Sequence, residues 1–143
     1  MQDNATLTSL YTALVDARNG YREAVKDATR ADLRTLFQDM ISLHEQALAQ
    51  LRPKLEARGA RADDSGSFMT TVHETVIAVR SAVTGLDDGS LDGFADGEAR
   101  IVKRYDEAIA DEQADPSLTS ILERQREAVS ARIDQLKGLA ERA

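Results

Sequence analysis

The sequence predicts an all-α protein, a four-helix bundle made of two similar helical hairpins. Long stretches are rich in Ala, Leu, Glu, Arg and Gln, which are good helix formers. Aromatic residues make up only 4% of the chain, which is low for a β-sheet core. Apolar residues recur at spacings of three and four, as on one face of a helix. The 143 residues match the size of one domain, so we expect a single bundle over residues 1–143.

The first predicted hairpin covers residues 6–58. Its first helix is expected over 6–28 and its second from residue 31 onward. Only Thr29 and Arg30 separate the two helices, so they must turn back on each other as an antiparallel pair. The stripe of the second helix comprises Leu33, Phe37, Met40, His44, Ala47, Leu51 and Leu55.

Pro53 and the following segment interrupt this regular pattern. At Pro53 we expect a kink or a break with a short restart before Gly59. Residues 59–89 are then expected to form a crossover, in which Ser67 caps a short extra helix over 68–83. A long helix of the hairpin spans roughly 35 Å, and 31 residues can easily return over that distance. A crossover of this kind is the ferritin-like arrangement of four helices.

The second predicted hairpin covers residues 90–142. Ser90 is expected to cap its first helix, which continues to about Gln113. Asp115 then caps the last helix and Pro116 takes the first helical position, where the missing N–H of proline costs nothing.

The two hairpins resemble each other in sequence. Shifting the first half by 84 or 85 positions matches Leu7–Arg58 to Leu91–Arg142, including Tyr21-Arg-Glu-Ala-Val with Tyr105-Asp-Glu-Ala-Ile. This agreement favours an internal duplication. The matched halves differ on the core stripe chiefly where Leu14 is replaced by Glu98, and where His44 is replaced by Val129.

Glu98 and His44 are the candidate site residues, because each places a polar group on an apolar stripe near the middle of the bundle. A buried carboxylate is costly unless it is paired. The alternatives are a Glu98–His44 pair, a Glu98–arginine pair with Arg18 or Arg132, a single metal site formed by Glu98 and His44, or a catalytic acid.

A complete di-metal centre is not expected. Such a centre in a bundle uses two glutamates and two Glu-x-x-His motifs, in which the i and i+3 residues point the same way. Ile41 lies three residues before His44, and Thr70 three before His73, so neither histidine has the required glutamate. Glu23, Glu107 and Glu127 lie off the core stripe and are expected at the surface. The hydroxyls of Tyr21 and Tyr105 are expected to reach polar partners.

Composition restricts the compartment and the partners. The chain has no cysteine, a net charge of −7, no basic stripe, no signal segment and no apolar run of the ~20 residues that cross a bilayer. We therefore expect a cytoplasmic protein that binds neither nucleic acid nor a membrane. A homo-oligomer and an unknown protein partner stay open. Val15, Ile41 and Val102 lie off the main stripes, so they either form a second contact surface or lie under the crossover.

The order of several motifs resembles a known family. These motifs are Tyr21-x-Glu-Ala24, Ser65-Gly-Ser67 followed by His73, Gly97-Glu98, and Tyr105-x-Glu-Ala-Ile109. Together they resemble an uncharacterised, mostly proteobacterial family of ferritin-like four-helix-bundle proteins, a domain of unknown function. The spacing of Glu98 and Tyr105 is also distantly similar to rubrerythrin-like proteins. That resemblance implies an iron ligand at Glu98 only, because the corresponding residue of the first helix is Leu14.

Two functional hypotheses follow. The first is a non-enzymatic ferritin-like helical-bundle protein without a cofactor, acting as an interaction or structural module. The alternative is a metal-binding, iron-handling and ferroxidase-like protein, with a degenerate site for iron or another divalent metal at Glu98 and His44.

Overall fold

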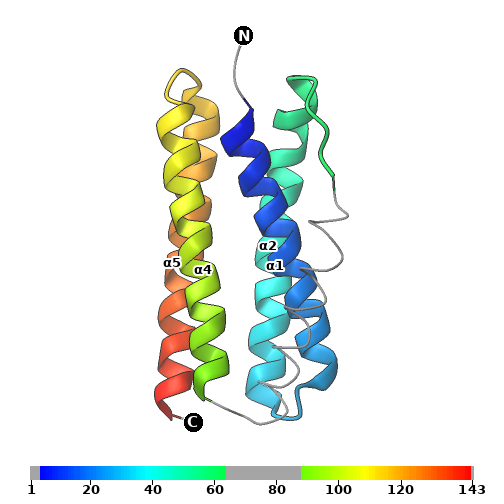
Figure 1. Ribbon diagram of the computed structural model, residues 1–143, viewed down its shortest axis with the longest axis vertical. Helices are drawn as coiled ribbons and strands as arrows, with labels where there is room; N and C mark the ends of the chain where they lie inside the picture. Colours follow the sequence, from blue (N-terminus) through cyan, green and yellow to red (C-terminus); the bar gives the residue numbers. More distant parts are fainter. Residues whose placement is uncertain (1–3, 64–87, 143) are drawn as a thin grey trace.

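The computed structural model describes residues 4–63 and 88–142, and these residues form four α-helices without a strand. The helices are α1 (Ala5–Asp27), α2 (Ala31–Ala57), α4 (Asp88–Asp111) and α5 (Pro116–Arg142). They lie side by side along one long axis (Figure 1). The predicted all-α fold is confirmed within these residues.

The helices pack as two hairpins laid against each other. The most extensive contacts join α1 to α2 and α4 to α5, and smaller contacts join α1 to α4 and α2 to α5. In the described residues, the backbone of α1 does not come close to that of α5, nor that of α2 to that of α4. These two pairs therefore occupy the diagonals of the bundle.

The direction of the helices shows how the hairpins are connected. In Figure 1, α2 ends at the top of the bundle and α4 begins at the bottom, so the two helices run in the same direction. The chain between them must return over the length of the bundle, as the sequence predicts. The predicted helix over 68–83 and its cap Ser67 lie outside the described residues.

The helix ends show why the chain turns where it does. At the end of α2, Gly59 has a φ of 76°, and the N–H of Ala60 donates to the carbonyl of Leu55 at 3.0 Å. This is the Schellman arrangement that glycine favours. At the start of α5, Asp115 Oδ1 accepts from the N–H of Leu118 at 3.2 Å, which confirms the predicted cap before Pro116.

Two local predictions are wrong. The predicted break at Pro53 is absent, because α2 continues through Pro53 to Ala57, whereas a kink there stays a prediction. Pro53 is exposed, while Leu51 and Leu55 on either side are fully buried, so packing on the inner face holds the helix together. The second error concerns Ser90, which lies inside α4 because that helix already begins at Asp88.

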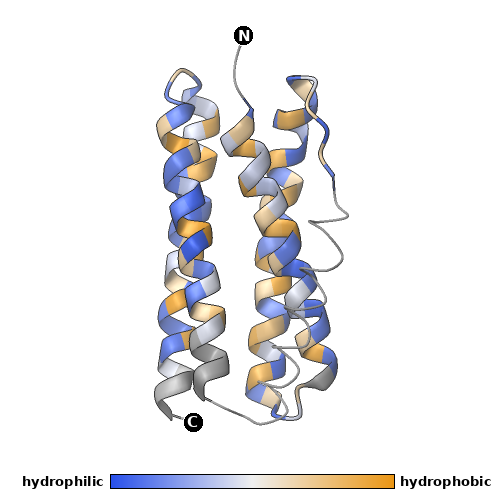
Figure 2. Cartoon of the chain, in the orientation of Figure 1, coloured by the Kyte–Doolittle hydropathy of each residue, from blue (hydrophilic) through white to orange (hydrophobic). Residues whose placement is uncertain are grey.

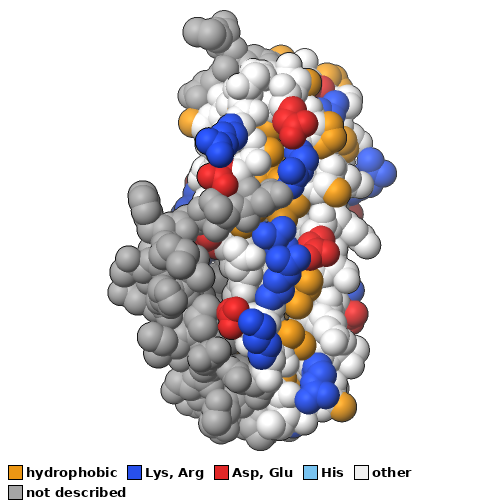
Figure 3. Space-filling model, turned by 90° about the vertical axis from the view of Figure 1, so that its right-hand side faces the viewer, with side chains coloured by type: hydrophobic (Ala, Val, Ile, Leu, Met, Phe, Trp, Pro, Cys, Tyr) orange, Lys and Arg blue, Asp and Glu red, His pale blue; other side chains and the backbone are white. Residues whose placement is uncertain are grey.

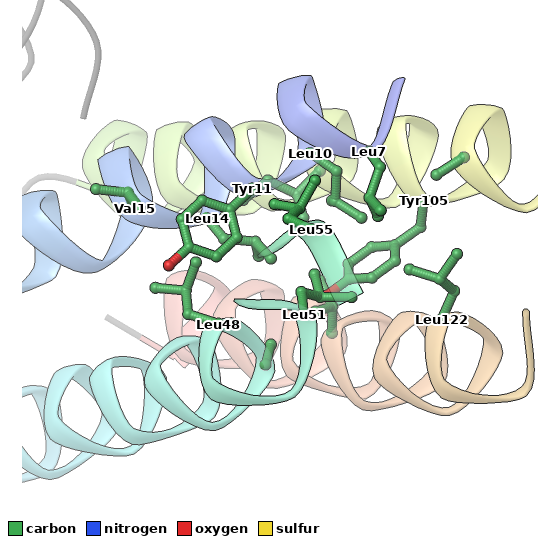
Figure 4. Close-up of a cluster of buried hydrophobic side chains, with 14 of the residues drawn as sticks. Leu7, Leu10, Tyr11, Leu14, Val15, Leu48, Leu51, Leu55, Tyr105 and Leu122 are labelled. Atoms are coloured by element: carbon green, nitrogen blue, oxygen red, sulfur yellow. The ribbon is translucent and has the colours of Figure 1, made fainter. Parts of the chain in front are cut away.

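Two hydrophobic clusters fill the bundle. The upper cluster lies toward the ends of α2 and α4, and Figure 4 shows Leu7, Leu10, Leu51 and Leu55 converging within it. The lower cluster lies toward the turn between α1 and α2. In Figure 2, apolar and polar positions alternate along each helix, as expected when one stripe faces the core. The lower cluster comprises Tyr21, Ala24, Ala28, Leu33, Leu36, Phe37, Met40, Ala95 and Leu136.

The off-stripe residues belong to these clusters. Val15 is fully buried in the upper cluster, and Val102 packs against it. Ile41 packs against the lower cluster. These three residues therefore contribute to the core and supply no evidence for a second contact surface.

Candidate functional site

The predicted polar residues meet where the two hydrophobic clusters join. His44 comes from α2 and Glu98 from α4, the two helices that face each other across a diagonal. Along α2, His44 lies between Met40 of the lower cluster and Ala47 of the upper one. Tyr21 of α1 completes the group. We call Tyr21, His44 and Glu98 the central polar cluster.

The three side chains share one carboxylate oxygen. His44 Nε2 lies 2.8 Å from Glu98 Oε1, and the hydroxyl of Tyr21 donates to the same oxygen, also at 2.8 Å. His44 is 0% exposed and Glu98 is 2% exposed. The predicted Glu98–His44 pair is thus present and shielded from water.

Two polar atoms of this cluster are not satisfied. Among the described residues, Glu98 Oε2 and His44 Nδ1 are buried without a hydrogen-bond partner. Buried polar atoms are usually paired, because each unpaired atom costs about 1–3 kcal/mol. If Glu98 is ionised, Nε2 must carry the hydrogen that it shares with Oε1.

Aromatic rings surround the central polar cluster. The ring of Tyr21 stacks on Phe94 at 5.0 Å between centroids and on His44 at 6.0 Å, and it lies 5.8 Å from Phe37. Burial, and secondarily the charge of Glu98, raises the pKa of the Tyr21 phenol well above its ordinary value of 10.0. Tyr21 is therefore a hydrogen-bond donor over the whole physiological range.

Neither Arg18 nor Arg132 is the partner of Glu98 in the structure. Arg132 lies 3.9 Å from Asp39 and donates to Gln135 at 2.8 Å, while Arg18 donates to the side chain of Asn19. Neither guanidinium replaces His44 as the partner of Glu98.

The off-stripe glutamates lie outside the core, as predicted. Glu23 pairs with Lys26 at 3.0 Å, and Glu107 and Glu127 are exposed. Within residues 4–63 and 88–142, no three His, Cys, Asp or Glu side chains form a group that could hold a metal ion. The candidate ligands Glu98 and His44 are thus brought together without a third residue of these types.

A second buried network surrounds Tyr105. Its hydroxyl donates to Gln125 Oε1 at 2.9 Å, and Gln125 Nε2 donates to Gln50 Oε1 at 2.8 Å. Burial, and secondarily Glu98, raises the pKa of the Tyr105 phenol. Both tyrosine hydroxyls therefore have polar partners, as predicted, although the sequence did not identify those partners.

Sequence reasoning missed a partly buried ion cluster at the end of the bundle where α2 and α4 terminate. Arg58 binds both carboxylate oxygens of Glu112 at 2.8 Å and lies 3.3 Å from Asp115. Glu112 is only 2% exposed. A negative charge at a helix C-terminus is unfavourable for the helix dipole. The position of Glu112 was therefore the one sequence feature from which a cationic partner could have been predicted. We call Arg58, Glu112 and Asp115 the end clamp.

The outer surface is polar and of mixed charge. On the face in Figure 3, lysine and arginine side chains form a broken line among acidic and small apolar groups. Arg22 pairs with Glu45, and Arg126 with Asp106, both at the surface. None of the described helices is both long and apolar enough to cross a lipid bilayer.

Comparison with known proteins identifies a family but no individual relative. Neither a curated protein nor a solved structure matches the chain. A family described as a domain of unknown function, DUF2383, matches residues 4–111, which include α1, α2 and α4 with Glu98. Since this match covers most of the chain, the protein belongs to the DUF2383 family.

Proposed function

We propose that this protein is a non-enzymatic helical-bundle module that binds a protein partner or a second copy through its surface. The central polar cluster then fixes how the two hairpins meet. One observation carries the proposal: the core residues suited to chemistry, His44 and Glu98, bond to each other and are 0% and 2% exposed. Reactive groups closed off in this way do not meet a substrate.

We also propose a ferritin-like arrangement that arose by internal duplication, in a cytoplasmic bacterial protein. The parallel course of α2 and α4 supports the topology. The matched residues Tyr21 and Tyr105 support the duplication, because each donates its hydroxyl to a buried acceptor. Glu98 and Gln125, the two acceptors, correspond to Leu14 and Met40 in the opposite halves. The proposed duplicated halves therefore share the tyrosine and differ in the residue that accepts its hydrogen bond.

Anaerobic titration with Fe(II), followed by exposure to air, tests the non-enzymatic role. We expect no stoichiometric binding and no oxidation faster than in buffer. Metal analysis of the purified protein provides an independent check. Sedimentation velocity over a wide concentration range tests self-association separately.

A second candidate function is metal binding at a degenerate, iron-handling site. The unsatisfied Glu98 Oε2 and His44 Nδ1 favour it, because carboxylate oxygen and imidazole nitrogen are both metal ligands. Tight Fe(II) binding that disappears in the H44V/E98L variant would establish this alternative and refute the non-enzymatic role. That variant is a suitable control, since it places in each half the residue found in the other half.

A further inference from the structure

We propose that the central polar cluster makes each hairpin specific for the other and prevents like hairpins from two copies of this chain from pairing. This rests on the proposed function, in which the cluster fixes how the two hairpins meet. The first hairpin is α1 with α2, and the second is α4 with α5. Two observations lead to the proposal: a two-fold arrangement of the hairpins, and the absence of polar counterparts to Glu98 and His44 at the matched positions.

The two hairpins are arranged so that one can take the place of the other. α1 packs on α4, and α2 packs on α5. In Figure 1, α1 and α5 run from top to bottom, whereas α2 and α4 run from bottom to top. Exchanging α1 with α4 and α2 with α5 therefore leaves the arrangement unchanged. Two copies of one hairpin could pack in the same way, and such domain swapping is a low-cost route to a dimer.

The central polar cluster joins residues that belong to different hairpins. Glu98 lies on the second hairpin, while Tyr21 and His44, which bond to its carboxylate, lie on the first. The counterpart of Glu98 is Leu14 and the counterpart of His44 is Val129, and both of these apolar side chains are buried. The carboxylate therefore meets the imidazole only when the first hairpin packs on the second.

Each pairing of like hairpins buries polar groups without these partners. Two first hairpins place His44 and Tyr21 opposite Leu14, which offers no acceptor. Two second hairpins place Glu98 opposite Val129, and a buried carboxylate without a partner is among the costliest groups in a protein core. A symmetric dimer repeats each of these contacts, so the cost arises twice.

Tyr105 does not remove this cost. As the counterpart of Tyr21 it would face Glu98 of a second copy, but its hydroxyl already donates to Gln125 of its own hairpin at 2.9 Å. The carboxylate would therefore lack an imidazole and compete for the only phenol. The pair of Glu98 and His44 thus distinguishes the hairpins.

The aromatic contacts across the same seam discriminate less. Phe94 of the second hairpin lies 5.0 Å from Tyr21 and 5.1 Å from Phe37 between ring centroids. Its counterpart in the first hairpin is Leu10, which is also apolar. Pairing of like hairpins exchanges one apolar contact for another here and leaves no polar group unpaired.

Moving the glutamate alone to the first hairpin tests the proposal. In L14E/E98L, the first hairpin holds both the carboxylate and His44, so two first hairpins satisfy each other, while two second hairpins meet through apolar groups at the same positions. We expect this variant to self-associate into a dimer at least about tenfold more tightly than the natural chain, as measured by sedimentation velocity. Equal self-association of the two proteins would overturn the proposal.

L14E/H44V/E98L/V129H is the matched control, because it exchanges the whole pair and again divides it between the hairpins. We expect its self-association to return to that of the natural chain, and a dimer as tight as that of L14E/E98L would overturn the proposal. All four positions are at most 2% exposed, so association through the surface is common to every variant. Failure of this test therefore leaves the proposed surface-binding role untouched.

A second variant applies if L14E/E98L does not fold, as judged by circular dichroism. H44V/V129H gathers the carboxylate and the imidazole on the second hairpin instead. We expect the same tightening of self-association in this variant. Self-association equal to that of the natural chain would overturn the proposal.

Discussion

At the scale of single residues, the buried tyrosines Tyr21 and Tyr105 have hydrogen bonds of different strength. Tyr21 donates to a carboxylate oxygen and Tyr105 to a neutral amide oxygen. Bonds to charged groups contribute roughly twice as much as neutral ones. The contribution of each tyrosine hydroxyl to stability should therefore depend on whether its acceptor is charged or neutral.

Removal of each hydroxyl measures this difference. We expect Y21F to lower the free energy of unfolding by about 1.5–3 kcal/mol, and Y105F by about 0.5–1.5 kcal/mol. Urea unfolding of the two variants provides the comparison, with Y105F as the matched control. A larger loss in Y105F would show that Glu98 does not act as a charged acceptor.

The Glu98–His44 pair should behave as a unit. E98L alone leaves His44 Nε2 and the Tyr21 hydroxyl without their acceptor, so we expect it to cost about 3–5 kcal/mol. H44V/E98L removes both partners and should recover much of that loss, because apolar residues often replace a buried polar pair without cost. A double-mutant cycle in urea measures the coupling. Additive losses would contradict the pairing.

At the scale of helices, the end clamp fixes the ends of three elements. Arg58 follows α2, Glu112 follows α4, and Asp115 caps α5. R58A leaves the carboxylate of Glu112 buried without a cation, and we expect it to lower stability by about 3–5 kcal/mol. R58K should recover only part of this, because an ammonium cannot bind both carboxylate oxygens side by side.

The control for the end clamp is a surface pair elsewhere in the chain. Arg126 also meets a carboxylate, that of Asp106, but both side chains are more than one-third exposed. Thermal unfolding of R126A should therefore differ from the natural protein by no more than about 1 kcal/mol. Similar losses in R58A and R126A would mean that burial of Glu112 does not matter.

The two prolines allow a matched test of helix geometry. Pro53 lies inside α2 on its exposed face, whereas Pro116 is the first residue of α5. P53A restores a backbone N–H and relieves a clash, so we expect it to stabilise the protein by about 1–3 kcal/mol. P116A should have little effect or be slightly destabilising, since the first helical position suits proline. Thermal unfolding measures both, and no gain in P53A would show that α2 accommodates the ring without strain.

At the scale of the whole molecule, the buried tyrosines make stability depend on alkaline pH. The pKa values of Tyr21 and Tyr105 are raised in the folded protein. Below pH ~10, both folded and unfolded chains keep the phenolic protons, and these groups add no pH dependence. Above it the unfolded chain releases them first, so the free energy of unfolding must fall as pH rises toward the folded pKa values.

Urea unfolding between pH 9 and pH 11.5 tests this dependence. We expect a steady decline in the natural protein and a shallower one in Y21F/Y105F, which lacks both phenols. Identical slopes would show that other groups control alkaline unfolding.

Much of this architecture could be predicted because it depends on period and turn length. The apolar stripes predicted the helices, and the short link at Thr29 and Arg30 predicted the antiparallel pairing of α1 with α2. The continuous course of α2 could not be predicted, because the strength of packing around Pro53 depends on neighbours from other helices. Periodicity describes one helix at a time and omits this support.

The candidate site shows the same division. The position of Glu98 on the apolar stripe predicted that it lies in the core. Whether its partner is His44 or an arginine could be decided only from the three-dimensional arrangement. The end clamp escaped prediction because Arg58 and Glu112 lie just beyond the ends of helices, where the stripe no longer defines a buried face. A buried ion pair between turns leaves no periodic signal.

The opposite placement of the end of α2 and the start of α4 has a consequence for assembly. The distance is that of one helix of 27 residues, about 40 Å, and an extended chain covers it with ~12 residues. The 30 residues 58–87 are thus more than an extended link over that distance requires. The covalent link keeps the two hairpins in one molecule, so their docking is an intramolecular event. Cleavage of the chain between the two hairpins would turn their docking into a concentration-dependent association.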